Sequence, residues 1–112
     1  MMVSSQVLLR NLLPDLGRLT LAQQAYIQHR ASVDFVVYNR VTNRPLLAIE
    51  VDGFAFHENN PDQRARDALK DEILDAHHMP LLRLPTTGSR EHQQIRRALD
   101  NAEVHWARLS AR

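Results

Sequence analysis

The densest group of potentially reactive side chains lies in residues 46–57, where an apolar run ends in acids. Glu50 and Asp52 are separated by one residue, Gly53 follows directly, and His57 comes four residues after the glycine. A carboxylate at the end of an apolar strand is unfavourable to bury unless a partner compensates its charge. Hard divalent cations such as Mg²⁺ prefer carboxylate oxygens as ligands. A metal centre is therefore one compensation that this segment can support.

A further acid, Asp34, interrupts the apolar segment 33–38 and lies sixteen residues before Glu50. If the two segments pair as a hairpin about residues 39–45, Asp34 and Glu50 stand opposite each other and can reach one ion. Two carboxylates and the carbonyl of Val51 are enough protein ligands for Mg²⁺, or for Mn²⁺ as its substitute, because Mg²⁺ keeps several water ligands. Such an ion can activate water and neutralise charge developing on a phosphodiester. The structural alternative is that these acids pair with arginines, such as Arg30, Arg44 or Arg83.

Two other residues of the segment have open roles. Asp52 is expected on the side of the strand opposite to Glu50, where it either supports the following loop or ligates the ion directly. His57 titrates near neutral pH and comes just after the acids, which makes it a candidate general base or proton shuttle. The alternative for His57 is an exposed histidine in a loop.

Residues 61–77 are predicted to form a helix that adds basic and amide groups to these acids. Asn60 and Pro61 suit the N-cap and first helical positions. Gln63, Arg66 and Lys70 would lie along one flank of the helix. Lys70 could then reach the scissile phosphate or polarise the attacking water, while Arg66 and Gln63 position phosphate. The alternative is surface pairing with neighbouring acids. The expected buried stripe consists of Ala65, Leu69, Ile73 and Ala76.

The elements that would position these residues are arranged as an α/β fold. Hydrophobic patterning predicts strands at 3–9, 33–38, 46–51 and 81–84, and helices at 21–29, at 61–77 and around 95–109. Thr20 and Gln23 form a capping box for the first of these helices. The hairpin argues an antiparallel pair, and the strand–helix–strand unit argues a parallel one. The sequence therefore predicts a mixed sheet of about four strands flanked by helices.

Composition bounds the class of protein. A chain of 112 residues with 24% charged residues and no cysteine fits one globular domain, 1–112, without disulfides. No apolar run reaches membrane-spanning length and no signal peptide is visible, so we expect a cytoplasmic protein and no membrane partner. Because the chain begins abruptly on a predicted strand, we expect a fragment of a longer protein that lacks its first helix.

Charge is distributed unevenly although the formal net charge is only +1. Residues 53–82 hold three basic and six acidic side chains, whereas residues 83–112 hold six arginines and three acids. An acidic middle next to a basic tail suits a metal site beside a phosphate-binding surface. The alternative is that these charges only keep helix surfaces soluble.

These motifs together resemble the D…(I)ELDG…H…RD…K(D)…LLR pattern of small restriction-endonuclease-like domains. Such domains belong to the PD-(D/E)XK nuclease superfamily, in a branch that includes families of unknown function often fused to helicases or topoisomerase-type zinc fingers. The spacing from Asp34 to His57 is also similar to that of very-short-patch mismatch-repair endonucleases. The resemblance covers residues 33–84, about half of the chain. It rests on these residues and segments: Asp34, 49–53, His57, 63–67, 70–71 and 80–84.

The resemblance implies an Mg²⁺-dependent endonuclease acting on nucleic acid, most simply DNA. It implies that Asp34 and Glu50 are metal ligands and that His57 is catalytic. The departure is at Asp52, where the superfamily pattern has lysine. Either Lys70 supplies the cation from its helix, or His57 carries out the proton transfer, or catalysis is impaired.

The alternative function is a catalytically inactive module that binds nucleic acid or serves as a scaffold in a helicase-type protein. A third reading is an accessory domain that only stabilises a helicase. With an active nuclease we expect Gln63, Arg66 and Arg83 to contact the nucleic acid.

Overall fold

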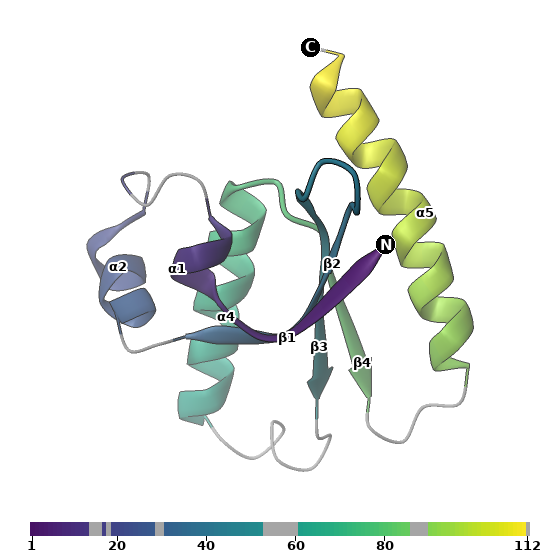
Figure 1. The fold of residues 1–112 in the computed structure, drawn as a ribbon. Helices are drawn as coiled ribbons and strands as arrows, with labels where there is room; N and C mark the ends of the chain where they lie inside the picture. Colours follow the sequence, from purple (N-terminus) through teal and green to yellow (C-terminus); the bar gives the residue numbers. More distant parts are fainter. Residues whose placement is uncertain (14–16, 18, 29–30, 53–60, 86–89, 112) are drawn as a thin grey trace.

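The computed structural model describes residues 1–13, 17, 19–28, 31–52, 61–85 and 90–111, with strands and helices in the predicted order (Figure 1). The elements are β1 (Met2–Leu8), α1 (Leu9–Leu12), α2 (Leu21–Gln28), β2 (Ser32–Tyr38), β3 (Pro45–Asp52), α4 (Pro61–Ala76), β4 (Leu81–Pro85) and α5 (Glu91–Ser110). No helix in these described ranges is long and apolar enough to cross a membrane.

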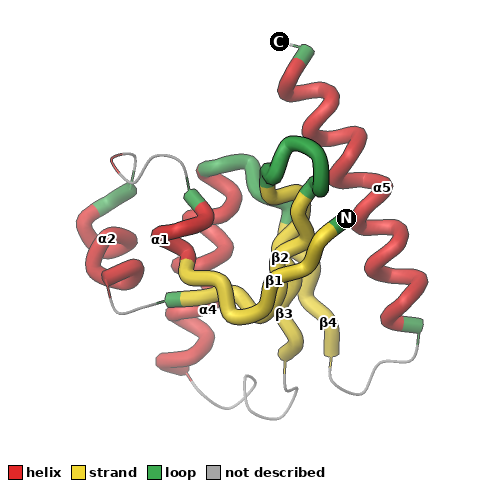
Figure 2. Tube along the Cα trace, viewed as in Figure 1, coloured by secondary structure: helices red, strands yellow, loops and turns green. Residues whose placement is uncertain are grey.

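The strands form one mixed sheet in the order β1-β2-β3-β4 (Figure 2). β1 pairs antiparallel with β2, β2 pairs antiparallel with β3, and β3 pairs parallel with β4. The predicted α/β fold class, with a hairpin followed by a parallel crossover, is confirmed. β3 lies between two strands, which agrees with its apolar residues on both faces.

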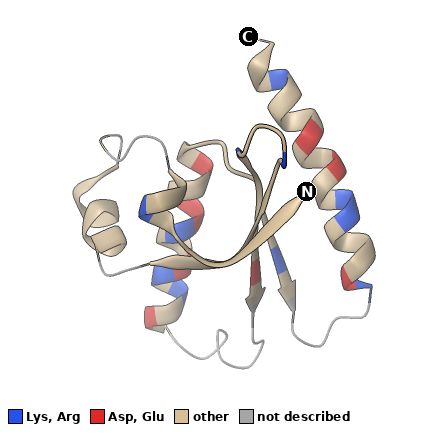
Figure 3. Cartoon of the chain, viewed as in Figure 1, with Lys and Arg blue, Asp and Glu red and all other residues tan. Residues whose placement is uncertain are grey.

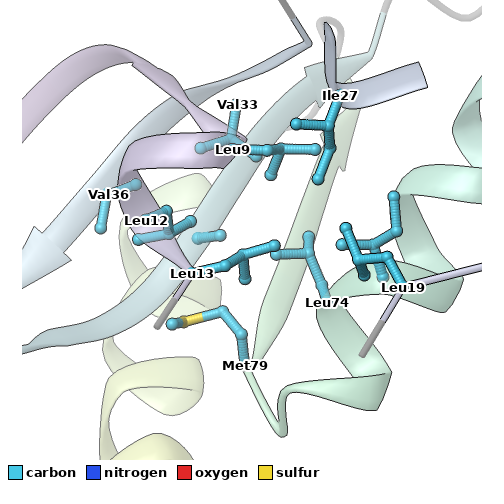
Figure 4. Packing of buried hydrophobic residues seen from close by; sticks show 11 residues of the cluster. Leu9, Leu12, Leu13, Leu19, Ile27, Val33, Val36, Leu74 and Met79 are labelled. Carbon is cyan, nitrogen blue, oxygen red and sulfur yellow. The ribbon is translucent and has the colours of Figure 1, made fainter. Parts of the chain in front are cut away.

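Helices cover both faces of the sheet and create two hydrophobic clusters. One cluster joins α1, α2 and α4 to the face that carries Val36 and Ala48, and Figure 4 shows its labelled side chains converging between these elements. The other cluster joins α5 to the face that carries Val37 and Leu47. Trp106 of α5 donates its indole N–H to the carbonyl of Leu46 at 2.9 Å, which ties this helix to β3.

Strand register brings the predicted acids together. β2 and β3 pair Phe35 with Ile49 and Val36 with Ala48, so the next position outward places Asp34 beside Glu50. On the other side of β3, Glu50 is the register partner of Arg83. Side chains alternate along a strand and register partners share a face. All three charged residues therefore belong to the face that α4 covers.

The expectation that Asp52 faces away from Glu50 is wrong in its premise. β3 continues through Asp52, which stays in register with Pro85 of β4. Residues two apart on an uninterrupted strand lie on the same side of the sheet. Strand alternation therefore gives no reason to separate Asp52 from Glu50. The side chain of Asp52 itself lies outside the described part of the structure.

The buried face of α4 also differs from the predicted stripe. Its buried residues are Lys70, Ile73 and Leu74, whereas Ala65 and Ala76 are exposed. Alanine side chains have little apolar area to bury, so they orient a helix weakly. The larger side chains decide the rotation of the helix, and Lys70 is carried to the inside with them.

Local sequence fixes the ends of the helices. The Thr20–Gln23 capping box is confirmed, because the Gln23 amide donates to Thr20 Oγ1 at 3.2 Å and the Thr20 amide donates to Gln23 Oε1 at 3.1 Å. After α4, His78 adopts a positive φ of 58°, and the Met79 amide donates to the Leu74 carbonyl at 2.9 Å. This is a Schellman-type ending, and it places the end of α4 close to the predicted boundary at residue 77.

Candidate functional site

The centre of the candidate site is a buried ion pair between β3 and α4. Glu50 is 6% exposed and Lys70 is 9% exposed. The Lys70 ammonium donates a hydrogen bond to Glu50 Oε1. Burial raises the pKa of Glu50, the Lys70 ammonium opposes that shift, and contact with Asp34 adds to it. The net direction is upward, because the cost of burying the charged carboxylate outweighs its stabilisation by the Lys70 ammonium.

Asp34 lies beside Glu50 on the neighbouring strand β2, and its side chain also binds the backbone of β3. Its Oδ2 accepts the backbone N–H of Val51 at 2.7 Å. The carboxyl group of Asp34 is close enough to that of Glu50 to help raise the pKa of Glu50. The predicted pairing of these two acids on adjacent strands is therefore present in the structure. Val51 contributes through its amide here, while the role predicted for its carbonyl oxygen stays a prediction.

Arg83 flanks the acids from β4. Its Nη2 donates to Asp71 Oδ1 at 2.6 Å, with the Arg83 side chain 27% exposed and the Asp71 side chain 53% exposed. Figure 3 shows the corresponding arrangement, with an acidic band on β3 beside a basic band on β4 and interleaved charges along α4. Arg83 is thus next to the carboxylates but is paired with the helix that covers them.

The other two residues of α4 that were predicted to contact nucleic acid are less buried than Lys70. Gln63 is half-buried, and its Nε2 donates to Asp67 Oδ1 at 3.1 Å. Arg66 is exposed, and its Nε donates to the Asp62 carbonyl at 3.4 Å. The helical spacing of Gln63, Arg66 and Lys70 keeps them on one flank of α4, but their burial differs along it. Lys70 is buried against Glu50, whereas Arg66 is exposed on the same flank, where it can meet a ligand arriving from outside.

Tyr26 of α2 is a site residue that sequence reasoning missed. Burial and the nearby carboxylates of Asp67 and Glu50 raise the pKa of Tyr26 to about 12, with Arg66 and Arg83 opposing the shift. The phenol therefore lies within the electrostatic field of the candidate site. The sequence signal is the helical spacing of Gln23, Tyr26 and Ile27, which defines the inward face of α2.

His57 lies outside the described residues, as does Gly53, so the structure does not place the predicted general base. In the ranges that the structure does describe, no three His, Asp or Glu side chains gather into a metal-binding group. The pair Asp34 and Glu50 still fits a hard cation chemically, since both donors are carboxylates on neighbouring strand positions and the pKa of Glu50 is raised. These two residues, with the Val51 carbonyl, are the ones that would hold Mg²⁺.

Comparison with known proteins defines the family by sequence. The chain belongs to the family described as Protein of unknown function (DUF2726), whose model matches residues 1–102. No curated protein and no solved structure matched the chain. Family membership therefore accounts for almost the whole chain, and the case for a function depends on the site.

Proposed function

We propose that this protein is an Mg²⁺-dependent endonuclease domain that hydrolyses phosphodiester bonds in nucleic acid, with DNA as the substrate. The observation that carries the proposal is the strand register that sets the carboxyl groups of Asp34 and Glu50 side by side, next to the ammonium of Lys70. Two carboxylates on one sheet face, with a lysine from the helix that covers this face, form a group suited to a hard cation and an anionic substrate. The resemblance of residues 33–84 to the PD-(D/E)XK nucleases supports the same reading.

The proposed roles follow from charge and position. When bound, Mg²⁺ would supply activation of water and neutralisation of phosphate charge. Asp34 and Glu50 hold the ion, and Lys70 fixes the orientation of Glu50 through Oε1. Lys70 would also supply the positive charge that the superfamily pattern places at the position of Asp52. His57 or Lys70 assists the attacking water, and Asp52 supports the ion or the adjoining loop.

Basic groups around the acids would bind the substrate backbone. Arg83 lies beside Glu50 in register, and Arg66 and Gln63 extend along α4. The arginines of α5 would add affinity that does not depend on sequence and weakens with salt. We further propose a cytoplasmic location and attachment to helicase-type or other domains in a longer chain.

The direct test is cleavage of supercoiled plasmid in the presence of Mg²⁺ or Mn²⁺. The wild-type protein is expected to nick the plasmid, and Asp34→Asn and Glu50→Gln are expected to abolish nicking. Glu72→Gln is a matched control, because this exposed acid of α4 hydrogen-bonds to Gln23 on α2 and not to the acids of the sheet. Cleavage that persists in both site variants would refute the assignment.

The second candidate function is a non-catalytic module that binds nucleic acid and has lost the reaction. It is favoured by the pairing of Glu50 with Lys70, because a neutralised carboxylate needs no further cation. The departure at Asp52 from the superfamily pattern supports it as well. Calorimetric titration with Mn²⁺ separates the two functions: saturable binding that Asp34→Asn removes supports the nuclease, and DNA binding without metal binding supports the module.

A further inference from the structure

Two consecutive residues of α4 carry opposite charges, and each forms an ion pair with one of two neighbouring strands. Lys70 pairs with Glu50 of β3, and Asp71 pairs with Arg83 of β4. Glu50 and Arg83 are themselves register partners in the parallel pair. Each of the two strand residues is therefore paired with a residue of α4, and not with its register partner on the neighbouring strand.

The pairing across the strands would be the expected one by distance alone. Adjacent strands lie about 4.8 Å apart, and register partners project to the same face. A guanidinium can therefore reach a carboxylate at the partner position and hold both of its oxygens in a bidentate contact. In the described residues no ion pair joins Glu50 to Arg83, and Arg83 is instead held at 2.6 Å by Asp71.

It matters chemically whether a lysine or an arginine side chain pairs with Glu50. Lys70 is a compact point charge that contacts one oxygen, Oε1, and leaves Oε2 for another partner. Arginine is permanently charged and presents a planar fork that matches both carboxylate oxygens. An arginine at Glu50 would therefore compete with a divalent ion for the same donor atoms, whereas the lysine leaves one of them available.

We propose that Asp71 is a positioning residue that keeps Arg83 turned away from Glu50 and so preserves the Asp34–Glu50 pair for a divalent cation. The inference rests on the proposed function, because it takes these two carboxylates as the cation site. It adds an acid that touches neither the ion nor the substrate.

The first experiment measures Mn²⁺ affinity by calorimetry in four proteins. These are the wild type, Asp71→Asn, the double variant Asp71→Asn/Arg83→Gln, and the control Asp75→Asn, which removes an exposed acid one turn further along α4. Asp71→Asn is expected to weaken Mn²⁺ binding by about tenfold. The double variant is expected to bind like the wild type, because the competing guanidinium is gone, and Asp75→Asn is expected to change little.

Rescue is the outcome that a merely structural role for Asp71 does not predict. If Asp71→Asn binds Mn²⁺ as the wild type does, or if the double variant stays as weak as the single one, the inference is overturned. Absence of Mn²⁺ binding by the wild type would contradict the proposed metal site itself, and the second experiment then decides about Arg83.

That second experiment is a crystal structure of Asp71→Asn without added metal. Arg83 is expected within hydrogen-bonding distance of Glu50 in this variant. An Arg83 side chain that stays apart from Glu50 would show that Asp71 does not position it. A circular dichroism spectrum matching that of the wild type confirms that the variant is folded before either measurement.

Discussion

Lys70 and Glu50 form an ion pair inside the protein, with the lysine on the helix and the glutamate on the central strand that the helix covers. The pair lies next to Ile73 and Leu74, which are fully buried in the same helix. Two opposite charges are therefore enclosed with the apolar core, and neither is compensated by water to the extent that a surface group would be. This arrangement determines how the protein responds to substitution and to pH.

Removing one partner of this pair should destabilise the fold strongly. We expect Lys70→Met to lower the free energy of unfolding by about 3 kcal/mol, because an uncompensated carboxylate stays buried. The double variant Glu50→Met/Lys70→Met should recover most of that loss, since no charge remains inside. Urea denaturation followed by circular dichroism measures both. Two independent, additive losses would show that the charges do not act as a pair.

Tyr26 should titrate at unusually high pH. Its pKa of about 12 compares with an ordinary value of 10.0, so the folded state favours the neutral phenol. The resulting contribution to stability is fully present below about pH 10 and is lost as the pH rises from about 10 to about 12. Ultraviolet titration of the folded protein should show a late phenolate component that Tyr26→Phe removes. The control is Tyr38→Phe, which should leave the late component; its persistence in Tyr26→Phe would contradict the placement.

Arg66 should contribute to nucleic-acid binding more than Arg64 does. Both side chains are exposed on α4, but they differ by two residues and therefore by about 200° around the helix. Arg66 lies within electrostatic reach of Tyr26, on the side of the candidate site. Arg66→Ala should weaken DNA binding severalfold and reduce the magnitude of the salt slope by about 1, as measured by fluorescence anisotropy. Equal losses for Arg64→Ala would indicate only a diffuse charge effect.

Trp106 should stabilise the packing of α5 on the sheet through a specific hydrogen bond. Trp106→Phe keeps an aromatic ring but removes the donor to the Leu46 carbonyl, leaving that acceptor without this partner. We expect a loss of about 1–3 kcal/mol in the free energy of unfolding. Val104→Ala is the control, because that side chain is half exposed on the same helix and its truncation should change stability by less than about 0.5 kcal/mol. An equal loss in Val104→Ala would show that the effect is not specific to the indole hydrogen bond.

The parts of the site that follow from strand register were predictable from sequence. Counting outward from the hairpin at 39–45 places Asp34 opposite Glu50, and the observed pairing of Phe35 with Ile49 confirms this count. Register matters here because a slip of one residue moves the side chains of a strand to the other face of the sheet, and Asp34 would then no longer share a face with Glu50. The capping box at Thr20 was also predictable, because it depends only on residues close together in the sequence.

The parts that depend on tertiary packing were not predictable. The rotation of α4 is set by Ile73 and Leu74 together with the ion pair of Lys70, and the alanines that suggested another face bury little area. The contribution of Tyr26 depends on how α2 lies against α4, which no pattern within α2 specifies. The separation predicted for Asp52 and Glu50 rested on a mistaken count of strand alternation, because residues two apart on a strand share a face.

The burial of Lys70 on the same helical turns as Ile73 and Leu74 has a consequence for how the protein loses its structure. α4 cannot move away from the sheet without breaking the ion pair and exposing these core residues together. The amide hydrogens around Lys70 should therefore exchange with solvent only through openings close in free energy to global unfolding. On heating, the site of Asp34 and Glu50 should then unfold together with the hydrophobic core in one cooperative transition.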